Sequence, residues 1–421
     1  MNRVLDIYIG NSLCGELAEE NNIWSFQYAA PWLSSPLAIA LCPKIPLQAE
    51  KQVDGSTHRP VQWFFDNLLP EESARILLAK DLREPVDDAF TLLTKAGGES
   101  AGAITLLPKG EPFGKGDVFT LSKEEMSQRI KNLPKVPLNR EGRKRMSLAG
   151  AQHKMLVVYD HGELLEPSGQ TPSTHILKPE HTSPEVYYHT PRNEWFCMAL
   201  AKACGLDTPE VDVLYMPEPV YAVKRFDRKG EYPLQERLHV LDGCQILSLP
   251  ATLKYRNSTS EYLDKLINLC RKKAISAITI YQWVCFNILI GNGDAHLKNI
   301  SFYSSKSGYE VAELYDLVST IIYEKQGEHM NAELSHPIGE ARHFSEVTRK
   351  GMLTFGKELG LAEKLASRLL DQLLSIVQVE ASKLIDQVEL GANHVGKAGE
   401  LRMLREIKFK CIDEMWQKLT S

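Results

Sequence analysis

The fold of this chain is decided by one stretch of sequence, Gly291-Asn292-Gly293-Asp294-Ala295-His296-Leu297-Lys298-Asn299. Asp294 and Asn299 lie five residues apart in it, and a second acidic residue, Asp316, follows. The residues between them, 300–314, read as a strand, a polar turn that ends in glycine and a returning strand, which is the pattern of a hairpin. We therefore expect the hairpin to bring Asp294, Asn299 and Asp316 to one place.

These residue types suit phosphoryl transfer. That reaction needs a carboxylate that accepts the proton of the attacking hydroxyl, and oxygen ligands that hold Mg²⁺ on the phosphates of the nucleotide. Asp294 suits the first role, and Asn299 with Asp316 suits the second. An alternative is that all three residues open turns or cap local structure. The hairpin and the second aspartate favour the layout of a protein-kinase-type site.

The composition is that of an ordinary globular protein. The 421 residues are enough for two or three domains, with 43% hydrophobic and 24% charged residues. The net charge of −5 excludes a global basic field that would hold the chain on nucleic acid by itself. The local basic cluster at 140–145 is more typical of a solvated face.

Cysteine usage and hydropathy indicate a cytoplasmic protein. The eight cysteines are scattered, without a C-x-x-C pair or a Cys/His metal-ligand spacing, which favours reduced thiols. The chain starts with the strand-like Val4–Ile9 and without a signal-peptide pattern. No apolar run approaches the ~20 residues that would span a bilayer. We therefore expect no membrane association.

Patterns along the chain predict an α+β, bilobal protein-kinase-like fold. Residues 1–108 mix strands and helices and form an extra N-terminal α/β subdomain. Residues 109–228 form a strand-rich N-lobe in which residues 109–145 are a connection and one helix, capped by Thr190, interrupts the strands. Residues 229–421 form a helical C-lobe. The helices expected there are 258–273, 276–290, 345–359, 361–389 and 397–419.

A lysine on an N-lobe strand should hold the α- and β-phosphates, positioned by a helical glutamate. Lys178 ends the strand-like stretch 174–178, and Glu194 lies on the helix that follows, so we assign this pair. Lys154 is the competing choice. The small residues of 147–154 would let backbone N–H groups approach phosphates closely, and 221–226 reads as the strand beside which adenine would lie.

Several motifs, in this order along the chain, resemble the HipA family, serine/threonine kinases that act as toxins of bacterial toxin–antitoxin pairs. They are Asn67-Leu68-Leu69-Pro70-Glu71, Gly97-Gly98-Glu99-Ser100-Ala101-Gly102-Ala103, Ser147-Leu148-Ala149-Gly150-Ala151-Gln152-His153-Lys154, Thr174-His175-Ile176-Leu177-Lys178, Arg225-Phe226-Asp227-Arg228, Asp242-Gly243-Cys244-Gln245, the stretch 291–299 and Tyr315-Asp316. They cover residues 4 to about 345, whereas the last 75 residues carry no signature of their own.

The resemblance implies roles for individual residues. Asp294 would be the proton acceptor, Asn299 and Asp316 would hold Mg²⁺, and Ser147 would be autophosphorylated. The residues that it places around ATP are Ala149, Gly150, Ala151, Gln152, His153, Lys154, Lys178, Lys224, Arg225, Phe226, His296, Leu297, Lys298, Asn299, Tyr315 and Asp316. It also implies a small helix-turn-helix antitoxin, contact with operator DNA through that partner, and an aminoacyl-tRNA synthetase as the protein substrate.

The chain departs from the family pattern at three positions. Lys224 stands where glutamate is usual, Leu241 replaces an acidic residue, and His153 stands where glutamate or proline is frequent. None of these positions is one of the expected catalytic residues. Two other functions stay open: a small-molecule phosphotransferase of the antibiotic-kinase type, and a non-catalytic co-repressor that acts with a helix-turn-helix partner.

Overall fold

The computed structural model describes residues 3–138, 149–150 and 152–421. Its chain forms two compact units. The strand-rich unit contains Met1–Thr182, Leu214–Leu253 and Phe302–Ser307. The helical unit contains Ser183–Val213, Lys254–Ser301 and Gly308–Ser421. The division differs from the expected boundaries, because the helix that we assigned to the N-lobe groups with the helical unit.

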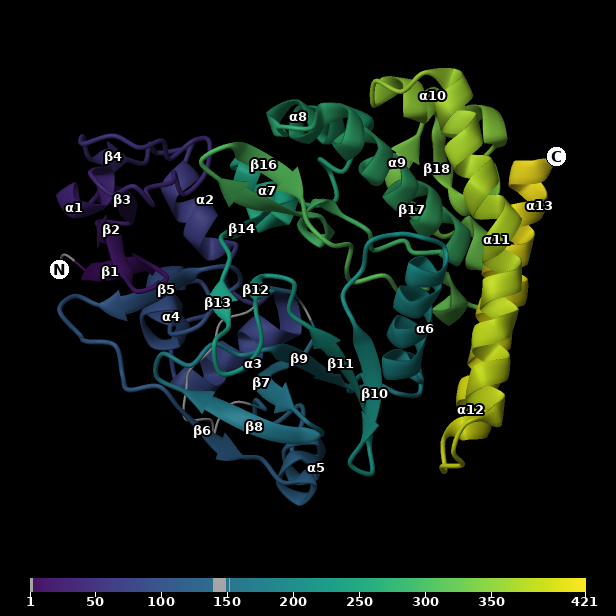
Figure 1. The fold of residues 1–421 in the computed structure, drawn as a ribbon, viewed down its shortest axis with the longest axis horizontal. Helices are drawn as coiled ribbons and strands as arrows, with labels where there is room; N and C mark the ends of the chain where they lie inside the picture. Colours follow the sequence, from purple (N-terminus) through teal and green to yellow (C-terminus); the bar gives the residue numbers. More distant parts are fainter. Residues whose placement is uncertain (1–2, 139–148, 151) are drawn as a thin grey trace. The chain divides into compact units, whose positions relative to one another are not determined.

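The strand-rich unit begins with an antiparallel sheet in the order β4-β3-β2-β1-β5 (Figure 1). Its strands are β1 (Arg3–Ile9), β2 (Ser12–Glu20), β3 (Ile23–Tyr28), β4 (Gln52–Val53) and β5 (Ile104–Pro108). The helices of this part are α1 (Ala30–Leu33), α2 (Pro60–Asp66), α3 (Glu72–Leu82) and α4 (Ala89–Ala96). A tight turn at Gly10 joins β1 to β2, and Gly10 has the positive φ of 59° that such turns favour.

A second sheet follows in the order β10-β11-β9-β7-β8-β6. Its strands are β6 (Asp117–Thr120), β7 (Met155–Asp160), β8 (Glu163–Ser168), β9 (His175–Pro179), β10 (Val211–Tyr215) and β11 (Pro219–Lys224). Short elements complete the unit: β12 (Arg228–Lys229), β13 (Glu236–Arg237), β14 (Val240–Asp242) and α7 (Gly243–Leu247). Asp242 caps α7 by accepting from the backbone N–H of Gln245, so this pair of the sequence motif has a structural role.

The expectation that residues 109–145 only connect two regions was wrong. They contain β6, which pairs with β8, and α5 (Lys123–Lys131). Ser122 and Glu125 form a capping box at the start of α5, a signal that the Lys-, Pro- and Gly-rich composition obscured. Met126 of α5 is buried in the core under the sheet, so tertiary packing completes the element.

The strand-rich unit contains a buried ionic cluster, which joins the segment after α4 to the segment after β11. Glu99 accepts from Arg228 at 2.9 Å and lies 3.5 Å from Arg225 and 3.8 Å from Arg237. Asp227 binds Arg225 through two hydrogen bonds of 2.8 and 2.7 Å. Burial by itself would raise the pKa of Asp227, but the two neighbouring guanidinium groups lower it to about 2. The motifs around Glu99 and Arg225 therefore encode one network.

The helical unit is built around α9 (Lys273–Ile290), which is buried along most of its length. Around it lie α6 (Thr190–Ala203), α8 (Ser260–Leu269), α10 (Arg349–Glu358), α11 (Glu363–Leu390), α12 (Lys397–Glu406), a π-helix (Ile407–Asp413) and α13 (Glu414–Thr420). Figure 1 shows the yellow C-terminal helices running along α11. The strands here are β15 (Ser301–Ser305), which crosses the unit boundary, β16 (Gly308–Val311), β17 (Glu333–Ile338) and β18 (Ala341–His343).

Three details of the helical unit differ from expectation. His189, not Thr190, is the cap of α6, and Thr190 begins the helix. The helix expected over 345–359 starts at Arg349. The helix expected over 397–419 is interrupted by the seven-residue π-helix, which no local sequence signal marks.

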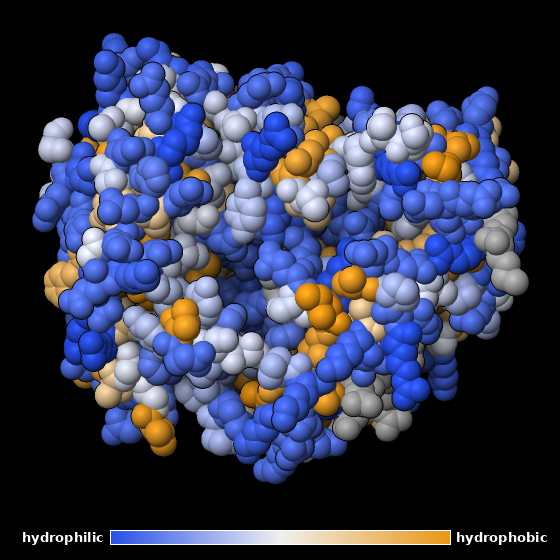
Figure 2. Space-filling view, turned by 180° about the vertical axis from the view of Figure 1, so that it is seen from behind, coloured by the Kyte–Doolittle hydropathy of each residue, from blue (hydrophilic) through white to orange (hydrophobic). Residues whose placement is uncertain are grey.

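α9 is long and apolar enough to cross a membrane by length and composition alone, contrary to the expectation from its sequence. However, 67% of this stretch is buried inside the protein, as in the core helix of a globular unit. On the face drawn in Figure 2, hydrophilic side chains predominate and apolar ones form separate spots. All eight cysteines lie in the described part of the chain, where they are buried and form no disulfide, and burial raises the pKa of Cys285 to about 12, so its thiol is inert.

Candidate phosphotransfer site

The catalytic loop, which we define as residues 291–299, begins where α9 ends. Gly291 closes the helix with φ = 68°, a left-handed conformation that favours glycine. A Cβ atom at this position would lie 2.5 Å from the side chain of Ile321, so the site also needs a residue without a side chain. Helix termination thus fixes where the loop starts.

Hydrogen bonds within the loop fix its shape. The buried Asn292 accepts from the backbone N–H of Asp294 at 3.0 Å and donates to Asn287 at 2.8 Å. Asn299 donates from Nδ2 to the backbone carbonyl of Asp294 at 2.7 Å. The structure therefore joins the two ends of the D-x-x-x-x-N motif directly. Because Nδ2 is the donor, the amide oxygen of Asn299 remains the atom suited to a cation.

The predicted hairpin brings Asp316 back to this loop. A hydrogen bond of 2.8 Å from the N–H of Ala312 to the carbonyl of Ser301 closes its base. The Tyr315 hydroxyl then donates to the carbonyl of Lys298 at 2.7 Å. On the other side of Asp316, the Thr320 hydroxyl accepts from the backbone N–H of Gly293 at 2.8 Å. Asp316 is thus held between two attachments to the catalytic loop.

Asp316 itself has φ = 58°, which is uncommon for a residue other than glycine. Unusual backbone conformations of this kind occur often where a side chain must point in one functional direction. Among the described residues no cluster of three or more His, Cys, Asp or Glu side chains could hold a metal ion. A site of Asn299 and Asp316 completed by nucleotide phosphates fits Mg²⁺, which is commonly held by one or two carboxylates and the phosphates of its substrate.

The carboxylate of Asp294 is accessible, with 45% of its side chain exposed. The Tyr255 hydroxyl donates a hydrogen bond to Asp294 Oδ1. His296 Nε2 lies 3.9 Å from the same oxygen, and its ring packs edge-to-face on Tyr255 at 4.9 Å. Sequence reasoning missed Tyr255, because its position 39 residues before Asp294 carries no local signal.

The other residues expected near ATP in this loop are buried. His296 and Lys298 are each 6% exposed and Leu297 is fully buried in the short 3₁₀ turn Leu297–Asn299. Their side chains therefore lie mainly within the protein, and the carbonyl of Lys298 is the acceptor for Tyr315. These residues shape the loop around Asn299.

The expected phosphate loop lies in the strand-rich unit. Gly150 has φ = 110°, and a Cβ there would meet Lys154 Nζ at 2.6 Å. Lys154 Nζ donates to the carbonyl of Ala149 at 2.6 Å, so this lysine closes the loop. The N–H of Glu71 donates to the carbonyl of Gly150 at 3.1 Å, which attaches the loop to the start of α3. Ser147 and Ala151 lie outside the described residues.

Gln152 and His153 of that segment are partly buried. Gln152 donates to the carbonyl of Pro179 at 3.5 Å, a long hydrogen bond that leads to the end of β9. Burial, and then the neighbouring His181, lower the pKa of His153. The departure from the family pattern at this position therefore adds a neutral side chain near neutral pH.

Lys178 lies on β9, opposite Tyr221 of β11, and is 6% exposed. Its Nζ is 5.8 Å from the centre of the Tyr221 ring. A buried lysine on a central strand is uncommon and agrees with a functional role. Glu194 is also buried, on α6 of the helical unit. Because the two residues belong to different units, their pairing stays a prediction.

Some of the residues expected beside the adenine make contacts with other parts of the protein. The Arg225 side chain is in the ionic cluster, and its N–H donates to the carbonyl of Thr174 at 2.8 Å. The carbonyl of Phe226 accepts from the Tyr303 hydroxyl at 3.0 Å. Lys224 is the last residue of β11 and is half-buried. A contact of Arg225 with the nucleotide would therefore have to be made by its backbone.

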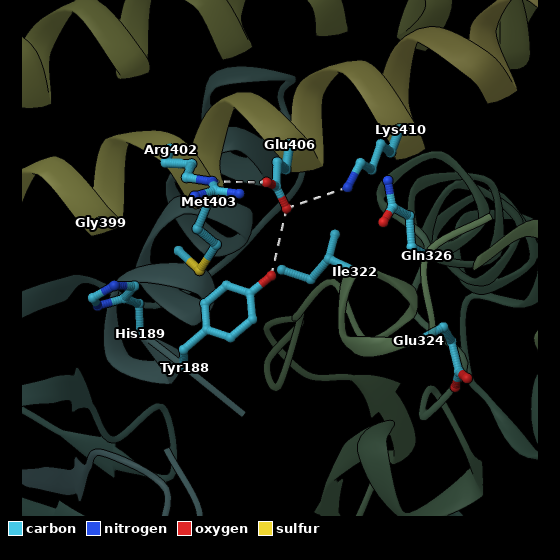
Figure 3. Close-up of a pocket in the computed structure, with 10 residues that line it drawn as sticks. All are labelled: Tyr188, His189, Ile322, Glu324, Gln326, Gly399, Arg402, Met403, Glu406 and Lys410. Carbon is cyan, nitrogen blue, oxygen red and sulfur yellow. Dashed lines mark hydrogen bonds and ion pairs between the residues drawn. The ribbon is translucent and has the colours of Figure 1, made fainter. Parts of the chain in front are cut away.

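A separate pocket of about 540 Å³ lies in the helical unit (Figure 3). Glu406 is its centre: it accepts from Tyr188 at 3.4 Å, from Arg402 at 3.2 Å and from Lys410 at 3.4 Å. One of the residues that line the pocket, Ile322, comes shortly after Asp316 in the sequence. None of the site residues expected from the sequence lines this pocket, so it is distinct from the catalytic loop.

α6 is attached to the segment after Asp316. Asn193, which is fully buried, donates to the carbonyl of Ser319 at 2.8 Å and accepts from its N–H at 3.0 Å. Asn193 also donates to the Tyr323 hydroxyl at 3.0 Å, and that hydroxyl donates to the carbonyl of Tyr188 at the pocket. A buried side chain of α6 therefore supports the backbone that carries Asp316.

Comparisons with known proteins agree with this geometry. The chain matches the HipA N-terminal domain over residues 5–107 and the HipA-like C-terminal domain over residues 146–380. The chain belongs to the HipA family. It is 33% identical over 342 residues to the serine/threonine-protein kinase toxin HipA of Shewanella oneidensis, covering 76% of each chain. It is 31% identical to the protein Y4mE of Sinorhizobium fredii, covering 91% of this chain and 92% of that one.

A solved structure of HipA from Shewanella oneidensis, in complex with HipB and operator DNA, matches 98% of this chain and 99% of its own with a TM-score of 0.81 and 27% identity. The α+β kinase-like fold expected from the sequence is confirmed, and this HipA-type protein is a serine/threonine-protein kinase. As a kinase, it uses a nucleotide as phosphate donor.

Proposed function

We propose that this HipA-type kinase transfers the γ-phosphate of ATP to serine or threonine residues of a protein, with Asp294 as the general base, and that it acts as the toxin of a toxin–antitoxin module. The observation that carries the proposal is the hydrogen bond of Asn299 to the carbonyl of Asp294, which joins the residue proposed as the base to a residue proposed as a metal ligand. The attachments of Asp316 to the same loop support it further.

In the proposed reaction, the acceptor hydroxyl passes its proton to the Asp294 carboxylate while its oxygen attacks the γ-phosphorus. The bond from the γ-phosphorus to the bridging oxygen of the β-phosphate breaks, and ADP leaves with that oxygen. The accessibility of the Asp294 side chain suits a base that must meet a protein substrate. A positioned general base commonly contributes about 10²–10⁴-fold to the rate.

The oxygen atoms of Asn299 and Asp316 would hold Mg²⁺, which when bound neutralises the charge on the phosphates. Lys178 would hold the α- and β-phosphates, and the backbone of 149–154 would approach them, with Lys154 closing the loop. The burial of Lys178 and the positive φ of Gly150 support these roles. ATP and Mg²⁺ are therefore the proposed cofactors.

For the partner, we propose a small helix-turn-helix antitoxin that brings the kinase to operator DNA. The complex of the Shewanella oneidensis HipA with HipB and operator DNA supports this assignment, as does the net charge of −5, which would not hold the chain on DNA by itself. The proposed target is an aminoacyl-tRNA synthetase in the cytoplasm, and the proposed autophosphorylation site is Ser147.

The direct test is transfer of labelled phosphate by the purified full chain with Mg²⁺ and ATP, followed by mass spectrometry. Wild type should label protein, including Ser147, and Asp294→Asn should lose at least about 100-fold of the rate. Asp386→Asn is the matched control, because Asp386 is an exposed aspartate on α11 of the same unit. An Asp294→Asn variant that keeps more than about a third of the activity would refute the base assignment, and transfer to small molecules alone would refute the protein-kinase assignment.

A further inference from the structure

Tyr255 contacts the proposed base, although nothing in the motifs of the chain marks it. It lies in the turn between the 3₁₀ helix Ala251–Leu253 and α8, and 48% of the residue is exposed. Its hydroxyl donates to Asp294 Oδ1, and its ring packs on His296 with an interplanar angle of 78°. A tyrosine on the protein surface thus reaches the reacting carboxylate.

The turn that carries Tyr255 is fastened to the catalytic loop through Ser258, which is fully buried. The Ser258 hydroxyl donates to the carbonyl of Lys254 at 2.7 Å and accepts from the N–H of Leu297 at 3.0 Å. One hydroxyl therefore joins the residue before Tyr255 to the residue after His296. Because both sides of the contact are connected through backbone groups, the Tyr255 hydroxyl is held at a set position relative to Asp294.

A carboxylate at the end of an aspartate rotates easily about its last torsion, since that torsion has broad minima. A hydrogen bond to one oxygen fixes the plane of the carboxylate and with it the direction of the second oxygen. We propose that Tyr255 is the positioning residue of Asp294: its hydroxyl orients the carboxylate so that the base meets the acceptor hydroxyl of the protein substrate. The inference rests on the proposed role of Asp294.

The test is Tyr255→Phe, which keeps the ring on His296 and removes only the donor oxygen. Because a misplacement of about 1 Å at a reacting group costs up to about 100-fold, kcat for phosphate transfer should fall about 10–100-fold. KM for ATP should stay within about twofold, and the melting temperature should be unchanged. The matched control is Tyr262→Phe, because Tyr262 lies nearby on α8 and its ring contacts the ammonium group of Lys265.

A double-mutant cycle separates positioning from a structural effect. If Tyr255 acts through Asp294, then Tyr255→Phe should cost nothing further in the Asp294→Asn background, whereas independent effects would multiply. If Tyr255→Phe lowered kcat in the Asp294→Asn background by the same factor as in the wild type, the proposal would be overturned. So would wild-type kcat in Tyr255→Phe with loss only in Tyr255→Ala, since the ring and not the hydroxyl would then be responsible.

The outcome is separable from that of the proposed function. If Asp294→Asn is as active as wild type, the base assignment fails whatever Tyr255→Phe does. If Asp294→Asn is inactive and Tyr255→Phe keeps the wild-type kcat, only the positioning role fails.

Discussion

Replacing Glu99 with glutamine should destabilise the strand-rich unit strongly. Glu99 is fully buried and is the anion shared by three arginines, at 2.9, 3.5 and 3.8 Å. The substitution keeps the shape of the side chain and an oxygen that can still accept from the Ser173 hydroxyl, now at 2.8 Å. It removes the charge and replaces one carboxylate oxygen with an amide NH₂ that cannot accept from a guanidinium group, so the measurement reports the loss of the shared anion from the network.

The magnitude follows from the geometry. At an effective dielectric constant of about 20, a pair of charges 2.9 Å apart attracts by roughly 6 kcal/mol, and the variant recovers the cost of burying the Glu99 charge. Removing one partner of a buried ion pair commonly costs about 3–5 kcal/mol, so we expect a loss of about 3 kcal/mol in the free energy of unfolding. Arg225 and Arg228 would keep Asp227 as their buried anion.

The assay is urea unfolding of the full chain, with a calorimetric scan to identify which transition moves. Glu111→Gln is the control, because Glu111 is an exposed residue of the same unit and should change stability by no more than about 0.5 kcal/mol. If Glu99→Gln lowered the free energy of unfolding by less than about 1 kcal/mol, water would have to solvate the charges of the arginines. The network would then not be the buried cluster described above.

Three further outcomes are expected. Burial lowers the pKa of His239 and of His336 to about 4, below the value near 6.5 in the unfolded chain, so between these pH values the unfolded chain binds more protons than the folded one. The free energy of unfolding should therefore be highest above pH 6.5 and should fall by up to ~3 kcal/mol per histidine as the pH drops towards 4. Urea titrations at several pH values would measure this fall. Gly291→Ala should cost about 2 kcal/mol or more in thermal unfolding, because of its positive φ and its contact with Ile321, and an unchanged melting temperature would contradict this. Asn193→Ala removes the three hydrogen bonds of Asn193 to Ser319 and Tyr323, in the segment after the proposed metal ligand Asp316, so kcat should fall at least about tenfold in phosphate-transfer assays while exposed-residue controls keep full activity.

The sequence by itself determined the features that neighbouring residues encode. The spacing of Asp294 and Asn299, the hairpin after them and the helix end at Gly291 all depend on contacts within a few residues, and each is present in the structure. Turn and capping preferences act over such short distances because they arise from backbone conformation and local hydrogen bonds. The family motifs extended this local information to the fold class.

Only the tertiary structure decided which distant residues meet. Tyr255 reaches Asp294 from 39 positions away, and Glu99 meets Arg225 from 126 positions away. The grouping of α6 with the helical unit and the π-helix before α13 depend on packing between elements in the same way. These contacts form because burial of apolar faces places the elements together, and the polar groups enclosed there must then find partners; neither condition is written in any local pattern of residues.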